Sequence, residues 1–277
     1  MLEKRHTTIC VGIAAVMCAA CAGPGATERA RALVRAHHED RALATLRDRL
    51  IVHPEDTAAR RLLIRLLGLT GDLGQAQTEV EELERRLGAG DPAPYLELGH
   101  ARELAHQFDE ALAAYDEAAR VAPSSPDGPR EGGMRCARWG ELEEAAPRLE
   151  EAVRRGAHDA EVWHVLGLVR IGLRDYDGAE RAYAEGTAAN PRAASNWLGL
   201  ATVAVARGDA ERALRAYQEV LVLAPKFADA ELGRAWALAK LGHKEQARQA
   251  LDRAEGLGAA GANLARQRAA LDAQPGL

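Results

Sequence analysis

The side chains of this chain that could perform chemistry are few, and their spacing does not suit it. His37, His38, Glu39 and Asp40 form the one dense cluster of potential metal ligands. Adjacent residues on a helix point about 100° apart, so His37 and His38 cannot face the same ion. The helical zinc motif H-E-x-x-H, which puts two ligands on one face, is absent. The cluster therefore indicates a solvated turn between two helices, and we predict no metal site.

Paired carboxylates are the other candidates for catalysis. Glu81-Glu82 and Glu143-Glu144 are expected on outer helix faces, where ion pairs contribute about 0–1 kcal/mol and acid–base catalysis has no enclosed site. The phosphate-binding motif G-x-x-x-x-G-K-[ST] and the nucleophile motif G-x-S-x-G are also absent. We therefore predict a protein that is not an enzyme and uses no cofactor.

The secondary structure that positions these residues is indicated by an alanine that recurs about every 34 residues. It occurs seven times, at Ala42, Ala76, Ala111, Ala145, Ala179, Ala213 and Ala247. A large apolar residue follows each alanine by four positions, and four copies have proline twelve positions after the alanine. A small residue lets two helices approach closely, the bulky residue one turn later packs beside the contact, and proline ends the second helix. Each unit is therefore predicted to be a helical hairpin that must stack on its neighbours to bury its apolar side.

Three copies resemble the tetratricopeptide repeat, whose pattern is W-x2-L-G-x2-Y, A-x3-F and a closing P. The residues that match in one copy are Trp163, Leu166, Gly167, Ala179, Tyr183 and Pro191. The copy from Trp197 to Pro225 and the copy from Tyr95 to Pro123 are similar. The resemblance implies an all-α, right-handed superhelical solenoid of about seven hairpins with a capping helix at the C-terminal end. In the fourth copy, Gly132 and Gly133 fall inside a helix, and we expect a weak helix and a possible hinge there.

The period also divides the chain. The expected boundaries are a signal peptide at 1–20, a lipid-anchored start at 21–22, repeats near 23–56, 57–91, 92–125, 126–159, 160–193, 194–227 and 228–261, and a capping helix and tail at 262–277.

In proteins of this family, the first helix of each hairpin lines a concave groove, and residues near repeat positions 5, 9 and 12 face into it. The resemblance therefore implies a groove that is charged in its earlier half, with Glu97, Glu103, Arg130, Glu131 and Arg138. It implies an apolar later half that binds a partner, formed by Leu168, Ile171, Leu198, Thr202, Val205, Leu232 and Trp236. Exposed aromatic residues such as Trp236 are common interface hot spots. The alternative is that the capping helix folds back and covers this stripe.

The first residues form a signal sequence. Lys4 and Arg5 precede an apolar run from Ile9 to Ala20, which is too short to span a bilayer. The run ends in small residues before Cys21, and this resembles the site at which bacterial lipoproteins are cleaved and acylated. Ala22 follows in place of the aspartate of an inner-membrane retention signal. We expect Cys21 to carry a lipid anchor in the outer membrane, facing the periplasm; ordinary cleavage, releasing a soluble periplasmic protein, is the alternative.

Charge and cysteine content agree with export. The formal net charge is −5, which argues against nucleic acid as a partner because nucleic-acid binding needs a basic surface. Beyond the signal region and Cys21, the one remaining cysteine is Cys136, which we expect to be a small buried hydrophobic residue.

The sequence therefore predicts a non-enzymatic scaffold of the bacterial envelope that binds a helical or extended segment of another protein. Assembly of a pilus secretin or of an outer-membrane complex is one expected setting. The alternatives are a soluble periplasmic accessory of polysaccharide synthesis or export, and a protease adaptor.

Overall fold

The computed structural model describes residues 25–273, and this part of the chain is built from fifteen helices without strands. The helices are α1 (Ala26–Arg35), α2 (Glu39–Val52), α3 (Thr57–Thr70), α4 (Leu73–Leu87), α5 (Ala93–Leu104), α6 (Phe108–Val121), α7 (Asp127–Trp139), α8 (Leu142–Arg154), α9 (Ala160–Gly172), α10 (Tyr176–Ala189), α11 (Ala194–Ala206), α12 (Ala210–Leu223), α13 (Ala228–Lys240), α14 (Lys244–Gly256) and α15 (Ala262–Asp272). The predicted all-α solenoid of seven hairpins and a final helix is confirmed.

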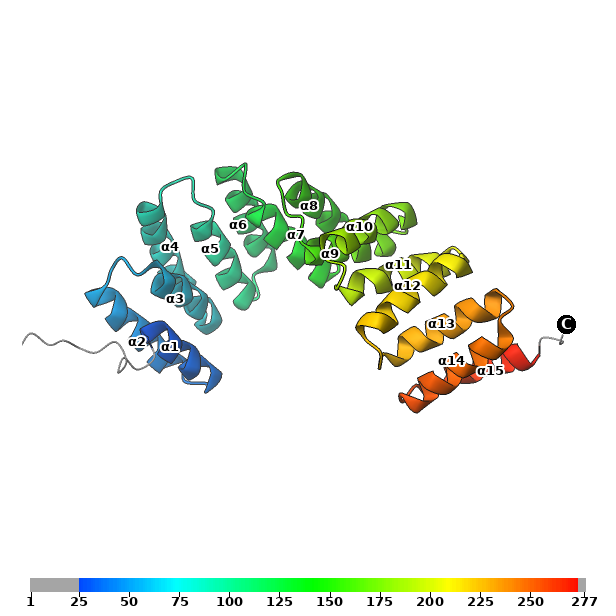
Figure 1. The fold of residues 1–277 in the computed structure, drawn as a ribbon. Coiled ribbons are helices and arrows are strands. Elements are labelled where there is room, and N and C mark those ends of the chain that lie inside the picture. Colours follow the sequence, from blue (N-terminus) through cyan, green and yellow to red (C-terminus); the bar gives the residue numbers. More distant parts are fainter. Residues whose placement is uncertain (1–24, 274–277) are drawn as a thin grey trace, which may run out of the picture.

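The hairpins stand side by side in an arch, with α1 at one end and α15 at the other (Figure 1). Each odd-numbered helix contacts the next odd-numbered helix, from α1 to α15. Within residues 25–273, the backbones of consecutive even-numbered helices lie farther apart, and long side chains such as Arg148 of α8, which binds Asp116 of α6, reach across the gap. Helices on the inner side of a curved stack lie closer together than those on the outer side. The odd-numbered helices therefore form the inner row of the arch, and the even-numbered helices form the outer row.

Aspartates begin five of the helices. The side chains of Asp56, Asp72, Asp159, Asp175 and Asp209 each accept a hydrogen bond from the backbone N–H three residues later, at 2.8–3.1 Å. Such a cap satisfies a backbone donor that has no partner inside the helix, and it contributes about 1 kcal/mol. These caps set where α3, α4, α9, α10 and α12 begin.

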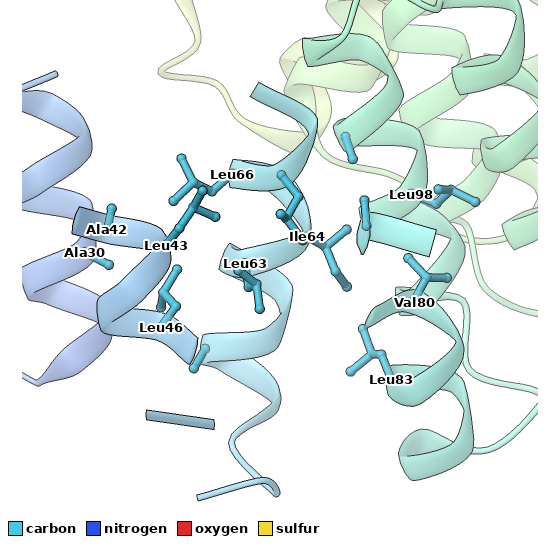
Figure 2. Close-up of a cluster of buried hydrophobic side chains, with 14 of the residues drawn as sticks. Ala30, Ala42, Leu43, Leu46, Leu63, Ile64, Leu66, Val80, Leu83 and Leu98 are labelled. Carbon is cyan, nitrogen blue, oxygen red and sulfur yellow. The ribbon is translucent and has the colours of Figure 1, made fainter. Parts of the chain in front are cut away.

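The core lies between the two rows as a series of clusters of buried apolar side chains. Figure 2 shows its first segment, a cluster that includes Leu46 of α2, Leu63 and Ile64 of α3 and Leu83 of α4. Each of these side chains is at most 1% exposed. Fully burying such a side chain stabilises the fold by about 1.5–3 kcal/mol. The repeating alanines Ala42 and Ala76 are fully buried beside them, as the period predicts.

The two glycines of the fourth repeat have a packing role that was not expected from the sequence; the weak helix and possible hinge stay a prediction. Helix α7 continues without interruption through Gly132 and Gly133, and both residues are buried. A Cβ atom at Gly133 would lie 2.8 Å from Cγ of Leu149. Glycine is therefore needed because α8 approaches α7 so closely, and its cost in helix propensity is offset by the burial of Leu149.

The last helix closes the end of the stack. Leu264 and Leu271 of α15 are buried against Leu251 of α14 and Leu232 of α13. No helix among the described residues is both long enough and apolar enough to cross a membrane.

Candidate binding groove

The free face of the inner row is the candidate binding surface. Helix α9 is covered by α10 from its own hairpin, by α8 from the preceding hairpin, and by α7 and α11 beside it. The remaining face of α9 is turned toward the hollow of the arch. Leu168 lies on this face and is 51% exposed, an unusually high value for a leucine in a helix packed on four sides.

The other predicted residues form rows that repeat every 34 positions. Thr202 of α11 lies one repeat after Leu168 and is exposed, and its hydroxyl donates to the carbonyl oxygen of Leu198 at 2.9 Å. Ile171 is half-buried against Tyr183 and Val203. Leu198 and Val205 are half-buried against the cluster of α11, α12 and α13. Leu168, Ile171, Leu198, Thr202 and Val205 thus come together on α9 and α11.

The two predicted residues on α13 differ from these. Leu232 is only 7% exposed and belongs to the cluster that α15 closes. Its side chain packs within the protein, so we leave it out of the surface proposed to contact a ligand. Trp236 is half-buried and packs against Tyr217 and Ala201. Helix α15 covers the end of the stack at Leu232, whereas the residues of α9 and α11 lie in other clusters.

Two polar atoms beneath the apolar surface have no hydrogen-bond partner. The hydroxyl of Tyr183 and Nδ1 of His164 are both buried, and the two rings lie 5.9 Å apart. The phenol ring of Tyr183 lies between Gly167 and Gly199, where Cβ atoms would lie 2.5 and 2.4 Å from it. Burial raises the pKa of Tyr183 and lowers that of His164, so both groups are neutral near pH 7. The floor of the groove between α9 and α11 is therefore uncharged.

The earlier half of the groove is a network of charges. Glu97 of α5 is fully buried, and its carboxylate accepts hydrogen bonds from Arg61 at 2.7 Å and from Arg65 of α3. Burial alone would raise the pKa of Glu97, but the neighbouring His100, Arg65 and Arg61 lower it to about 2. Glu97 is therefore ionised at any physiological pH.

His100 connects this network to α7. Its Nε2 lies 3.3 Å from the carboxylate of Glu131, and its Nδ1 lies 3.8 Å from Glu97, close enough for charge attraction but not for a hydrogen bond. Burial opposes the charged imidazole, but the two carboxylates outweigh it and raise the pKa of His100. Arg135 donates to Glu103 at 2.7 Å and pairs with Glu131 at 3.1 Å.

The network continues toward α9. Arg138 also binds Glu103, and Arg130 donates to Glu161 of α9 at 3.2 Å. The charged groups here are bound to one another, so they join neighbouring helices of the inner row. The free surface of the groove is consequently its apolar half.

The prediction missed the arginines that complete the network. Arg61, Arg65 and Arg135 lie 36, 32 and 32 residues from the carboxylates they bind. The signal was present in the sequence as opposite charges about one repeat apart. Such pairs face each other across neighbouring inner-row helices.

The remaining candidates for chemistry are placed as follows. His37 lies in the turn between α1 and α2 and is exposed. No group of three His, Cys, Asp or Glu residues in the part described is positioned to hold a metal ion. Cys136 is fully buried with a free thiol, as predicted. Cys21 and the signal peptide expected at 1–20 lie outside the described residues.

Comparison with known proteins tests the resemblance. The family model for the tetratricopeptide repeat matches three overlapping segments, residues 138–192, 164–204 and 198–263. The matched segments together span residues 138–263, so this part of the chain is similar to tetratricopeptide repeats. The preceding hairpins continue the same stack of inner-row and outer-row helices.

Solved structures with tetratricopeptide repeats share the fold. YrrB, described as having an unusual peptide-binding site, superposes with a TM-score of 0.61 at 19% identity, covering 69% of this chain and 97% of YrrB. The C-terminal part of a repeat-containing protein from Cytophaga hutchinsonii gives a TM-score of 0.65 at 16% identity, covering 87% and 98% of the two chains. At these identities the likeness concerns the fold alone.

One curated protein is also similar in sequence. It is the heat-shock protein cognate co-chaperone sgt12 of Aspergillus fumigatus, which is 29% identical over 112 residues. The match spans 39% of this chain but only 33% of the co-chaperone.

Proposed function

We propose that this protein is a non-enzymatic scaffold that holds a segment of a partner protein in the concave side of its arch. Tetratricopeptide repeats mediate interactions between proteins, and YrrB, which shares the fold, has a peptide-binding site. The proposal places the segment on α9 and α11, with its apolar side chains against Leu168, Ile171 and Leu198.

The observation that supports this most directly is the exposure of Leu168 on the inner row. Its equivalents one and two repeats earlier are Met134 and His100, which are partly covered by the charge network or the neighbouring hairpins. Leu168 therefore begins the part of the groove where apolar surface meets water. Because half of this side chain is already covered, burying the rest contributes about 1 kcal/mol.

The chemistry of the surface defines the segment. The floor between α9 and α11 is uncharged, because His164 and Tyr183 are both neutral near pH 7. The apolar groove residues are one or two helical turns apart on each helix and one repeat apart between α9 and α11. A bound helix with apolar residues at i, i+4 and i+7, or an extended segment with alternating apolar residues, would match this arrangement. A highly charged segment would lose its hydration here without gaining a partner.

For the location of the protein, the proposal is a lipid tether at Cys21 that holds the arch at the periplasmic face of the bacterial outer membrane. The support is the basic start, the apolar run and the small residues before Cys21. Two or more acyl chains are enough for stable anchoring, because each buried methylene contributes about 0.8 kcal/mol. In this setting the partner would be an envelope protein, such as a subunit of a secretin or of an outer-membrane complex.

Photocrosslinking in living cells tests the groove. A benzoylphenylalanine residue at position 168 should trap one partner protein, which mass spectrometry would identify. The matched control is position 222 of α12, because Val222 is also apolar and is 73% exposed but lies on the outer row. Equal trapping at the two positions, or none at 168, would contradict the proposal.

Labelling with palmitate tests the tether separately. The wild-type protein should incorporate the label, and the Cys21→Ser variant should not. Absence of incorporation in the wild type would instead favour a soluble periplasmic accessory protein or protease adaptor. That result would leave the groove proposal standing.

A further inference from the structure

On the opposite side of the arch, two cavities occupy equivalent places two repeats apart. One, of about 680 Å³, lies between α6, α7 and α8, and the other, of about 500 Å³, lies between α10, α11 and α12. Volumes of about 300–1,000 Å³ are typical of ligand sites. Because the backbones of consecutive outer-row helices are set apart, both cavities open between two outer helices above one inner helix.

Both cavities arise where the repeat lacks its usual large residue. The last position of the pattern W-x2-L-G-x2-Y is usually an aromatic residue. In the fifth repeat this position is Arg170. In the fourth and sixth repeats, 34 residues earlier and later, it is Cys136 and Ala204. Cys136 lies in the lining of the first cavity, and Ala204 in that of the second. In the second and seventh repeats the same position is filled by the buried side chains of Leu67 and Leu238.

The second cavity shows how an arginine can be held at this place. The guanidinium of Arg207 binds Glu180 at 2.5 Å and also binds Asp177, both on α10. Arg212 binds the other oxygen of Glu180 at 2.6 Å. The carboxylates in this region are thus matched by arginines of the chain itself.

The first cavity also has carboxylates in its lining, but it has no arginine at the position equivalent to Arg207. The residue 68 positions before Arg207 is Trp139, and the residue 68 positions before Asp177 is Asp109. Asp109 and Glu141 both line the cavity, and neither has an ion pair or a side-chain hydrogen bond within the described part of the chain. The third carboxylate, Glu144, is already bound by Arg148 at 2.6 Å. No basic side chain lines this cavity.

Aromatic rings form the rest of the wall. The rings of Trp139 and Phe108 are 4.9 Å apart, and Phe108 is 42% exposed. A guanidinium group stacks well on such rings, and nearby carboxylates bind its N–H groups. An ammonium group lacks the planar shape that fits both features.

We propose that the cavity between α6, α7 and α8 binds an arginine side chain of a partner polypeptide. The guanidinium would lie against Trp139 and Phe108 and donate to Asp109 and Glu141, in the role that Arg207 has beside Asp177 in the second cavity. The aliphatic part of the side chain would cover Leu112 and the floor at Cys136. This site is on the outer side of the arch, so it is independent of the groove on α9 and α11.

Fluorine NMR of protein labelled with 5-fluorotryptophan tests this site. The probe is the tripeptide acetyl-Gly-Arg-Gly-amide, compared with the same peptide carrying citrulline, which has nearly the same shape but no charge. Titration with the arginine peptide should move the resonance of Trp139, assigned by Trp139→Phe, and leave those of Trp163, Trp197 and Trp236 nearly unchanged. The citrulline peptide should bind at least fivefold more weakly.

Two variants make the test specific. Cys136→Leu fills the first cavity with the residue found at this position in other repeats and should abolish the shift, whereas Ala204→Leu fills the second cavity and should not affect it. The double variant Asp109→Asn and Glu141→Gln keeps the cavity and removes its charge, and should weaken binding at least fivefold. This double variant decides the matter if Cys136→Leu does not fold, as judged by circular dichroism.

The proposal is overturned by any of three results. These are equal binding of the arginine and citrulline peptides, binding by the double variant that equals wild type, or equal shifts of all four tryptophan resonances.

Discussion

Arg65 of α3 binds Glu97 of α5 with two of its nitrogens, although the two residues are 32 positions apart in the chain. Glu97 is fully buried, whereas the side chain of Arg65 is 44% exposed. The pair therefore joins two neighbouring inner-row helices at a carboxylate that the fold encloses completely. Its geometry explains why the earlier groove is polar: the charges there bind the hairpins together.

Replacing Glu97 tests this role in stability. Glu97→Gln removes the charge that Arg61, Arg65 and His100 bind, and we expect a loss of about 2 kcal/mol in the free energy of unfolding, because a charged hydrogen bond contributes about 1.5–3 kcal/mol. Urea denaturation followed by circular dichroism measures the change. Glu143→Gln, at an exposed position of α8, is the control and should change stability by less than about 0.5 kcal/mol. Similar effects of the two variants would show that the network does not join the hairpins.

The stability of the contact between α5 and α7 should depend on pH because His100 can change its charge. The pKa of His100 is raised in the folded protein by Glu131 and Glu97 despite burial. The charged imidazole therefore contributes stability that is complete below its unfolded pKa of about 6.5 and is lost as the pH rises through the higher folded value. The melting temperature should fall as the pH rises above about 6.5, and it should fall less in His100→Gln. Arg65 and Tyr115 also face His100 but remain in one protonation state over this range. An identical pH dependence in wild type and His100→Gln would exclude this role.

The close packing around Tyr183 should make Gly199 intolerant of a side chain. In Gly199→Ala the new Cβ would lie 2.4 Å from Cε1 of Tyr183, so the ring or α11 must move. Overpacking of this kind costs about 1–3 kcal/mol. Gly256→Ala in α14 is the matched control, since nothing lies within 4 Å of its new Cβ and alanine favours a helix. The two melting temperatures should therefore change in opposite directions, and an unchanged or higher value for Gly199→Ala would disprove the packing argument.

Much of this architecture could be predicted from the sequence because the repeat imposes the same packing on each hairpin. The hairpins follow from the alanine at every period and the proline after the second helix, whereas the groove positions follow from the resemblance to the tetratricopeptide repeat. Cys136 was correctly expected to be buried.

Other features depend on contacts between repeats, and these cannot be predicted from the helix propensity of single residues. Gly133 reads as a weak point of a helix, yet it allows Leu149 to pack. Leu232 has the repeat position of a groove residue, but α15 closes the cluster around it. The cavity beside Trp139 has a small residue in its floor and two unpaired carboxylates, one from α6 and one from the residue before α8, which only the folded arrangement brings together.

The central claim is that the inner face of α9 and α11 binds the partner, and the affinity of a charged variant tests it most directly. Once the protein trapped at position 168 is identified, its binding to purified Leu168→Asp and Val222→Asp should be measured by isothermal titration. We expect Leu168→Asp to weaken binding at least tenfold, equivalent to about 1.4 kcal/mol, with unchanged helical content. Val222→Asp should bind as wild type does. Unchanged affinity of Leu168→Asp, or an equal loss in both variants, would contradict the account.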